Sequence, residues 1–318
     1  RLSLSDKEIQ SRVEKIVDAT AENPDVFAYY LVDEPGADAY PGLKKWKDAW
    51  AEAAPSALSY INLFPNYASP AQMDANDYES YLEKFVSIVD PEYISYDHYA
   101  LMEDGSLREG YFANLGAVRK VSLKYDLPFW NIVLSNAHHD YIDPSSASLS
   151  FQLYTTLAYG GKGISYFTYF APDIGNYRLA PVDQFGNKTR TWDMLRNVNL
   201  QMHAIGKAYI QLESVHVFHH PKIAECKSGF EDSRFLSSLE VKRGGGADLL
   251  VGEFVDDAEN PLIIVVNKSL EQSKMIDLSF KAEGRIYQIN NYSGEAEPWR
   301  GENNWLGPGQ GRIFFVKK

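Results

Sequence analysis

The chain has 318 residues, of which 45% are hydrophobic and 23% charged, and its formal net charge is −12. This is the composition of an ordinary globular protein, and an acidic chain without basic runs argues against a nucleic acid or an anionic membrane surface as partner. No stretch approaches the roughly 18 apolar residues of a membrane-spanning helix, and Cys226 is the only cysteine, which excludes an internal disulfide.

Helix and strand patterns alternate through the first two thirds of the chain. Ser5 and Glu8 have the spacing of a capping box, so a helix is predicted to begin there. Short apolar runs then alternate with segments of helical periodicity about every 30 to 37 residues, which is the pattern of parallel β/α units. The predicted strands are 27–34, 58–63, 93–99, 129–134 and 164–169, and the predicted helices after the first are 43–54, 78–89, 112–124, 149–158 and 191–210.

The first of these strands ends in two acids. Six apolar residues, 27–32, run without alternation into Asp33 and Glu34, as in a parallel strand that is covered on both faces. Pro35 cannot donate to a sheet, and proline favours an extended residue before it. Alternation along the strand predicts that Glu34 faces the interior and that Asp33 points the other way. Chemistry in α/β proteins is placed at the carboxyl ends of such strands.

The pattern changes after about Glu213. Helical periodicity stops, and short alternating runs separated by turn residues predict a β-sandwich of about 100 residues. We therefore expect two domains, a β/α domain over 1–213 and a β-sandwich domain over 214–318. The predicted strands of the second domain are 249–255, 262–266, 275–280, 286–289 and 313–316.

Five strand–helix units fit two architectures. An open doubly wound sheet accepts five strands, whereas a (β/α)8 barrel needs eight units and typically about 250 residues. The helix at Ser5 enters with no strand before it. In a barrel, strands one to three would therefore lie upstream of Arg1, and this chain would associate with that N-terminal segment.

Two motifs carry a resemblance to a known enzyme class. Asp33-Glu34-Pro35 resembles the Asn-Glu-Pro end of strand four in clan A glycoside hydrolases, which include the family 42 β-galactosidase-like enzymes, and 157–169 resembles their passage from helix seven to strand eight. The ending at 306–309 is similar to that of their small C-terminal β-domains. The resemblance implies a (β/α)8 TIM-type barrel that lacks its first three strands here. It also implies that Glu34 is the general acid/base, that no cofactor is needed, and that the protein is periplasmic or extracellular.

The second catalytic carboxylate departs from the clan A pattern. Those enzymes carry a nucleophilic glutamate at the end of strand seven, where this chain has Leu134-Ser135-Asn136-Ala137. Asp97, at the end of the predicted sixth strand, is the alternative partner, as nucleophile or as base for water. A carboxyl separation of about 5 Å would fit retention of configuration, and about 6.5–9.5 Å would fit inversion.

Polar and aromatic residues near the other strand ends are predicted to contact substrate. His138-His139-Asp140 could be read as metal ligands, but adjacent histidines in a loop rarely both bind one ion without a third ligand placed nearby. We expect them to hydrogen-bond a sugar instead. The predicted substrate-binding residues are Asp33, Asn62, Tyr96, His98, Tyr99, Asn136, His138 and Tyr169.

The sequence therefore favours a glycoside hydrolase that cleaves O-glycosidic bonds of an oligo- or polysaccharide by carboxylate acid/base catalysis. One alternative is a carbohydrate-binding barrel that has lost its nucleophile, for which the missing acid on strand seven is the evidence. A second alternative is a small open α/β domain of unrelated function. The predicted partner is a carbohydrate in the first two cases.

Overall fold

The structure is a computed structural model that describes residues 4–301 and 304–317. The chain divides into two compact units. The first consists of Arg1–His98 and Gly116–Asn131, and the second of Tyr99–Leu115 and Ile132–Lys318. Within the described part of the chain, no helix has the length and apolar character needed to cross a membrane.

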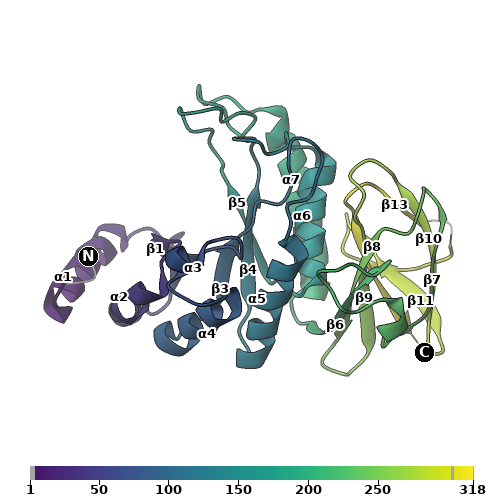
Figure 1. Cartoon of the computed structure of the whole chain (residues 1–318), viewed down its shortest axis with the longest axis horizontal. Coiled ribbons are helices and arrows are strands. Elements are labelled where there is room, and N and C mark those ends of the chain that lie inside the picture. Colours follow the sequence, from purple (N-terminus) through teal and green to yellow (C-terminus); the bar gives the residue numbers. More distant parts are fainter. Residues whose placement is uncertain (1–3, 302–303, 318) are drawn as a thin grey trace. The chain divides into compact units, whose positions relative to one another are not determined.

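Five parallel strands form one sheet in the order β1-β2-β3-β4-β5, and helices alternate with them along the chain (Figure 1). Each connection moves the chain one strand further in the same direction, whereas a doubly wound sheet reverses direction at a switch point. The order is therefore that of a TIM-type barrel sector. The strands are β1 (Ala28–Asp33), β2 (Leu58–Leu63), β3 (Ile94–Asp97), β4 (Phe129–Leu134) and β5 (Gly163–Phe167). The helices are α1 (Asp6–Thr20), α2 (Tyr40–Ala53), α3 (Pro70–Met73), α4 (Tyr78–Val89), α5 (Tyr111–Tyr125), α6 (Ser146–Ala158) and α7 (Arg190–Tyr209).

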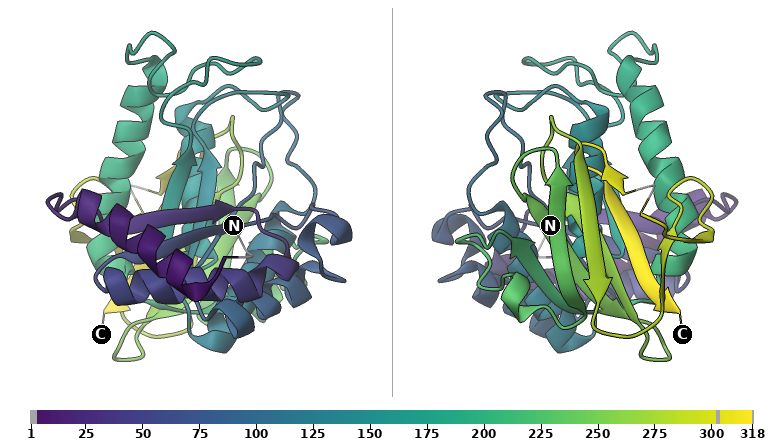
Figure 2. Two further views of the ribbon diagram at one scale, coloured as in Figure 1. Left: turned by 90° about the vertical axis from the view of Figure 1, so that its left-hand side faces the viewer. Right: turned by 90° about the vertical axis from the view of Figure 1, so that its right-hand side faces the viewer.

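The local patterns predict most of these elements correctly. Ser5 and Glu8 form the predicted capping box of α1, and β2, α4 and β4 have the predicted bounds. α1 packs on α2 (Figure 2), and Ile9 of α1 and Trp50 of α2 belong to one buried apolar cluster. These elements agree because capping and periodicity are local properties of the sequence.

Strand β1 differs from its prediction in burial. Among the described residues it pairs only with β2, so it is an outer strand of the sheet. Its side chains are half-buried or exposed, and Tyr30 is 55% exposed. The prediction of a strand covered on both faces is therefore wrong for β1, because an unbroken apolar run does not reveal whether a neighbour covers the edge.

A bulge in β1 changes which residues share a face. Tyr30 is opposite Tyr60 of β2, but the next pair is Val32 with Ile61, so β1 contains one extra residue at this point. A bulge of this kind resets the alternation of side chains. Tyr30 and Asp33 consequently face the same side of the sheet.

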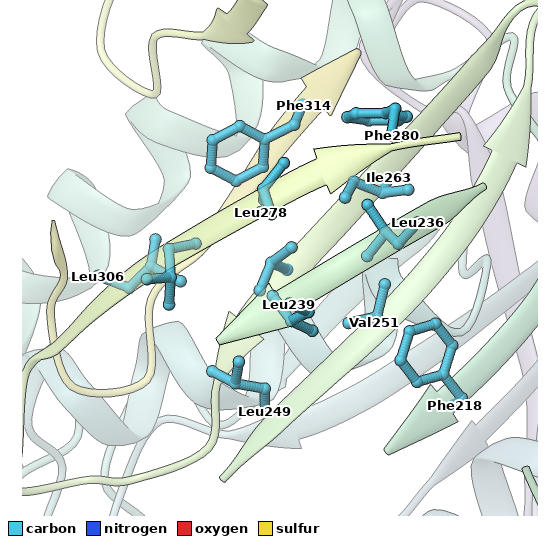
Figure 3. Close-up of a cluster of buried hydrophobic side chains, with 12 residues drawn as sticks. Phe218, Leu236, Leu239, Leu249, Val251, Ile263, Leu278, Phe280, Leu306 and Phe314 are labelled. Carbon is cyan, nitrogen blue, oxygen red and sulfur yellow. The ribbon is translucent and has the colours of Figure 1, made fainter. Parts of the chain in front are cut away.

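Two antiparallel sheets make up the C-terminal β region. One has the strand order β12-β11-β14-β9-β8-β6, and the other β13-β10-β7. Apolar side chains from both sheets, including Phe218, Leu278 and Phe314, form their common core (Figure 3). The strands are β6 (Glu213–His220), β7 (Leu236–Arg243), β8 (Leu249–Val255), β9 (Pro261–Asn267), β10 (Lys274–Phe280), β11 (Arg285–Ile289), β12 (Ala296–Pro298), β13 (Trp305–Leu306) and β14 (Gly311–Lys317).

The five strands predicted here are present, and the sequence analysis missed β6, β7, β12 and β13. Helix α6 packs on β8 and β9 of the larger sheet. Gly252 of β8 permits this approach, because a Cβ atom at that position would lie 2.1 Å from the carbonyl oxygen of Ala158 in α6. The larger sheet therefore contacts a helix of the β/α region as well as the smaller sheet.

Candidate functional site

Acidic and amide side chains meet at the carboxyl ends of β1, β2 and β3. Asp33 and Asp97 are the last residues of β1 and β3, and Asn62 lies one residue before the end of β2. The Nδ2 group of Asn62 donates to Oδ1 of Asp33 at 3.1 Å and to Oδ1 of Asp97 at 2.8 Å. Its Oδ1 accepts a hydrogen bond from Ser95 Oγ at 3.0 Å. One amide therefore holds two carboxylates, and the serine fixes the orientation of that amide.

Asp33 belongs to this cluster, contrary to the predicted alternation. The hydroxyl of Tyr30 donates to Asp33 Oδ1 at 2.8 Å, and the ring of Tyr30 lies 5.2 Å from that of Tyr60. The bulge in β1 is the reason, since it turns Asp33 toward the face that Tyr30 and Asn62 occupy. The prediction that Asp33 points away from the site is wrong, because a bulge leaves no signal in the apolar run.

The backbone at Glu34 also differs from expectation. Its φ is +46°, in the left-handed region rather than the extended one that Pro35 favours. The amide of Glu34 donates to the carbonyl oxygen of Asn62 at 2.8 Å. The hydroxyl of Tyr81 donates to the carbonyl oxygen of Pro35 at 2.7 Å, so the residue after Glu34 is also held by a hydrogen bond. Unfavourable backbone conformations held in this way concentrate at functional sites.

The Glu34 carboxyl has an unusual proton affinity. Its side chain is half-buried. This burial is the main cause that raises the pKa of Glu34 to about 7, and the nearby charges of Asp97 and Asp33 raise it further. Both effects disfavour the ionised form of the acid. A carboxyl group with a pKa near 7 can donate and accept a proton at neutral pH, which is what a general acid/base requires.

Replacing Asp97 with asparagine is expected to lower the pKa of Glu34 from about 7 toward its ordinary value of 4.5. The change removes one of the two negative charges near Glu34 and keeps an oxygen that can accept the hydrogen bond from Asn62. Carbon-13 NMR of the labelled Glu34 carboxyl, assigned with Glu34→Gln, measures this titration. Asp25→Asn, an exposed change in the same unit, is the control. A Glu34 pKa that stays at its wild-type value in Asp97→Asn would show that the charge of Asp97 does not contribute to it.

Two further predicted site residues lie on β3 and just after it. Tyr96 is fully buried between Ser95 and Asp97, so its side chain points to the opposite face of the strand, where its ring lies 6.5 Å from Phe129. The structure therefore does not bring Tyr96 to the carboxylates. His98 is also fully buried, with its ring edge-on to Tyr67 at 5.0 Å.

A second group of predicted residues lies in the second unit. His138 Nδ1 is 3.0 Å from Oδ1 of Asn136, and the His138 ring stacks on Tyr177 at 4.6 Å and contacts Tyr99 edge-on at 6.0 Å. Burial, with the nearby charges of His139 and Arg178, lowers the pKa of His138 to about 4, so the ring is neutral at pH 7. An amide oxygen only accepts, so Nδ1 carries the proton and Nε2 is an acceptor.

This second group offers groups that suit sugar hydroxyls. The buried Nδ2 of Asn136 has no hydrogen-bond acceptor among the residues that the structure describes. Tyr169, which follows β5, is 51% exposed, and its ring packs edge-on against Phe170 rather than against His138. The described residues contain no group of three or more His, Cys, Asp or Glu side chains arranged to hold a metal ion.

Sequence reasoning missed two members of the first group, Tyr30 and Ser95. Ser95 is two residues before Asp97 on β3, so strand alternation places both on one face and could have identified it. Tyr30 could not be found in this way, because its contact with Asp33 depends on the bulge between them.

No family model and no curated protein matches the sequence, but solved structures match the fold. A glycoside hydrolase family 5 structure from Bacteroides vulgatus aligns with 99% of this chain and 67% of its own, at a TM-score of 0.58 and 12% identity. Another glycoside hydrolase structure aligns with 98% of this chain and 69% of its own, at a TM-score of 0.56 and 11% identity. This chain spans about two thirds of the length of both. It shares its fold with solved glycoside hydrolases, the class that its sequence resembles.

Proposed function

We propose that this chain is the catalytic part of a glycoside hydrolase and that Glu34 is its general acid/base. The observation that carries the proposal is the half-buried Glu34 carboxyl, whose pKa is raised to about 7 beside Asp97 and Asp33. Hydrolysis of a glycosidic bond needs such a group to protonate the leaving oxygen and then, in retaining enzymes, to deprotonate water. The shared fold with glycoside hydrolases supports this assignment.

Asp97 is proposed as the second carboxylate, acting as nucleophile or as base for water. It is only 5% exposed, and its Oδ1 is held by Asn62. Asp33 is the competing candidate, since it faces the same side, is exposed, and is bound by the same amide. Asn62 and Ser95 would then position the carboxylates rather than take part in the reaction.

The remaining predicted substrate contacts are proposals of the same kind. His98 in the first unit, and Tyr99, Asn136, His138 and Tyr169 in the second, carry the amide, imidazole and phenol groups that bind sugar hydroxyls. We also propose that the natural substrate is an oligo- or polysaccharide and that the protein is periplasmic or extracellular. Both proposals rest on the resemblance in sequence.

We further propose that the five strands are strands four to eight of an eight-stranded barrel. Each outer strand borders an apolar groove, as expected where further β/α units would pack. Beside β1, a groove of about 780 Å³ is lined by residues that include Leu31 of β1 and Trp46 of α2. Beside β5, a groove of about 570 Å³ is lined by residues that include Tyr166 of β5 and Leu200 of α7. An upstream segment of three β/α units would cover both strands.

The test is turnover of a panel of neutral aryl glycosides and oligosaccharides by the natural polypeptide that carries this chain. We expect at least one to be hydrolysed, with activity falling as the pH rises above about 7, because Glu34 must be protonated to act as an acid. Proton NMR of the first-formed anomer decides between retention and inversion.

The variants Asp97→Asn and Asp33→Asn identify the second carboxylate. The variant with the larger loss of kcat marks the residue that acts as nucleophile or base. Sugar binding without turnover of any substrate would favour the non-catalytic alternative.

A further inference from the structure

A small polar cavity lies in the C-terminal β region, on strands that the proposed catalytic residues do not use. Its volume is about 250 Å³, just below the usual range of about 300–1,000 Å³ for pockets that bind drug-sized ligands. It would suit a ligand of the size of one sugar unit. Its walls include Gln288, Asn291, Tyr292, Glu297, Trp305 and Arg312.

Three of these side chains form a chain of hydrogen bonds from a cation to an anion. Nη1 of Arg312 on β14 donates to Oε1 of Gln288 on β11 at 3.0 Å. Nε2 of Gln288 donates to Oε1 of Glu297 on β12 at 2.6 Å. The register supports this arrangement, since Gln288 is directly opposite Glu297 in the sheet. The charges of Arg312 and Glu297 balance each other across one amide, so the cavity favours an uncharged ligand over an anion.

Asn291 adds an amide oxygen whose partner is absent. It is 9% exposed, and its Nδ2 donates to Tyr154 Oη and to the carbonyl oxygen of Gly311, both at 2.8 Å. Its buried Oδ1 accepts no hydrogen bond from the residues that the structure describes. A buried amide oxygen of this kind costs free energy unless a donor reaches it.

Two aromatic rings stand beside these polar groups. Trp305 on β13 is 44% exposed, and Tyr292, in the turn after β11, is 71% exposed. The backbone carbonyl oxygen of Trp305 accepts a hydrogen bond from Nη2 of Arg312 at 3.3 Å, which connects Trp305 to the hydrogen-bonded side chains. Exposed aromatic faces give apolar contact to the C–H face of a sugar, while amides and carboxylates bind its hydroxyls.

We propose that this cavity binds one neutral sugar unit of an oligosaccharide, as a site separate from the catalytic one. The choice of a sugar among neutral polar ligands rests on the proposed function. The polar chain of Arg312, Gln288 and Glu297 binds the hydroxyls, and Trp305 and Tyr292 pack on the ring. Such a site would hold the protein on the glycan that it cleaves and raise the effective concentration of substrate.

The experiment uses the Glu34→Gln variant of the natural polypeptide, so that the probes are not cleaved. Neutral β-linked cello-, xylo-, manno- and galacto-oligosaccharides are titrated into protein whose tryptophans carry nitrogen-15 in the indole ring. We expect the indole signal of Trp305, assigned with Trp305→Ala, to shift saturably with at least one of them. Calorimetry of Trp305→Ala and Tyr292→Ala on the same background is expected to show this binding weakened about tenfold or more.

Phe27→Ala is the matched control, because Phe27 is an exposed aromatic (64%) in the other unit, and the change should leave binding at wild-type strength. A Trp305 signal that does not move with any of the four sugars overturns the proposal. Unchanged affinity in both Trp305→Ala and Tyr292→Ala also overturns it. Turnover by the wild-type protein is measured separately. A shift of the Trp305 signal without turnover would support this binding site and contradict the proposed enzyme function. Turnover without a shift of the Trp305 signal would support the enzyme function and contradict this binding site.

Discussion

Replacing Glu34 with glutamine is expected to lower kcat by about 10²- to 10⁴-fold, the usual contribution of a general acid/base. Glutamine has nearly the same shape but cannot donate a carboxyl proton. The fall in wild-type activity above a pH of about 7, which reports the ionisation of Glu34, should also vanish from the residual activity. Steady-state kinetics from pH 5 to 9 measure both effects.

The leaving group provides a control for the role of Glu34. An aryl glycoside with a very acidic phenol needs little protonation, so Glu34→Gln should impair its cleavage far less than that of an alkyl glycoside. An equal loss on both substrates would indicate that Glu34 positions the sugar instead of donating a proton, and full activity on the alkyl glycoside would remove it from the mechanism.

Loss of folding can be separated from loss of chemistry. The pKa of Glu34 is raised in the folded protein, so the folded state holds more protons than the unfolded state between about pH 4.5 and 7. The contribution of Glu34 to stability therefore declines as the pH rises through that range. Glutamine cannot ionise, so Glu34→Gln should be at least as stable as wild type at pH 8.

Replacing Glu253 with alanine is expected to lower the free energy of unfolding by about 3 to 5 kcal/mol, because several hydrogen-bond donors lose their acceptor and each such loss costs roughly 1 to 3 kcal/mol. The carboxylate is completely buried on β8. It accepts hydrogen bonds from Ser233 Oγ at 2.6 Å and from the amides of Arg234 and Phe235 at 2.9 and 3.0 Å. Alanine would leave the buried Ser233 hydroxyl and the two partly buried amides without this acceptor. Chemical denaturation followed by tryptophan fluorescence measures the change.

The pH dependence of stability gives a second readout at Glu253. Burial alone would raise the pKa of Glu253, but the hydrogen bonds from His216, Ser233 and the two amides hold it below its usual value. A lowered pKa stabilises the folded state above about pH 4.5, and this contribution is lost as the pH falls further. Glu253→Gln should remove that acid-dependent contribution while losing less stability than alanine.

Glu240→Ala is the matched control, on strand β7 of the smaller sheet. Glu240 pairs with Lys242 at the surface, where its side chain is 61% exposed, and such pairs contribute about 0–1 kcal/mol. A loss in Glu253→Ala as small as that in Glu240→Ala would show that the buried carboxylate does not hold the loop at Ser233.

Sequence signals predicted helices and strands correctly where the residues of one element are enough to determine its conformation. The capping box at Ser5 and the apolar periodicity of 78–89 each depend on residues within one or two turns, and both predictions are confirmed. The strands 58–63 and 129–134 were also predicted with the bounds that the structure shows. Strand β7 was missed because its side chains are buried on one face only, and polar residues break its apolar run.

The sequence by itself determined the order of β/α units, the C-terminal β region and the placement of Glu34 at a strand end, since periodicity, turn residues and Pro35 are local. Only the tertiary structure decided how the carboxylates meet. Pairing with β2 creates the bulge that turns Asp33 to the face of Asn62, and Asn62 then binds both Asp33 and Asp97. These contacts join residues about 30 positions apart, and their geometry depends on strand register, which no single segment of the chain encodes.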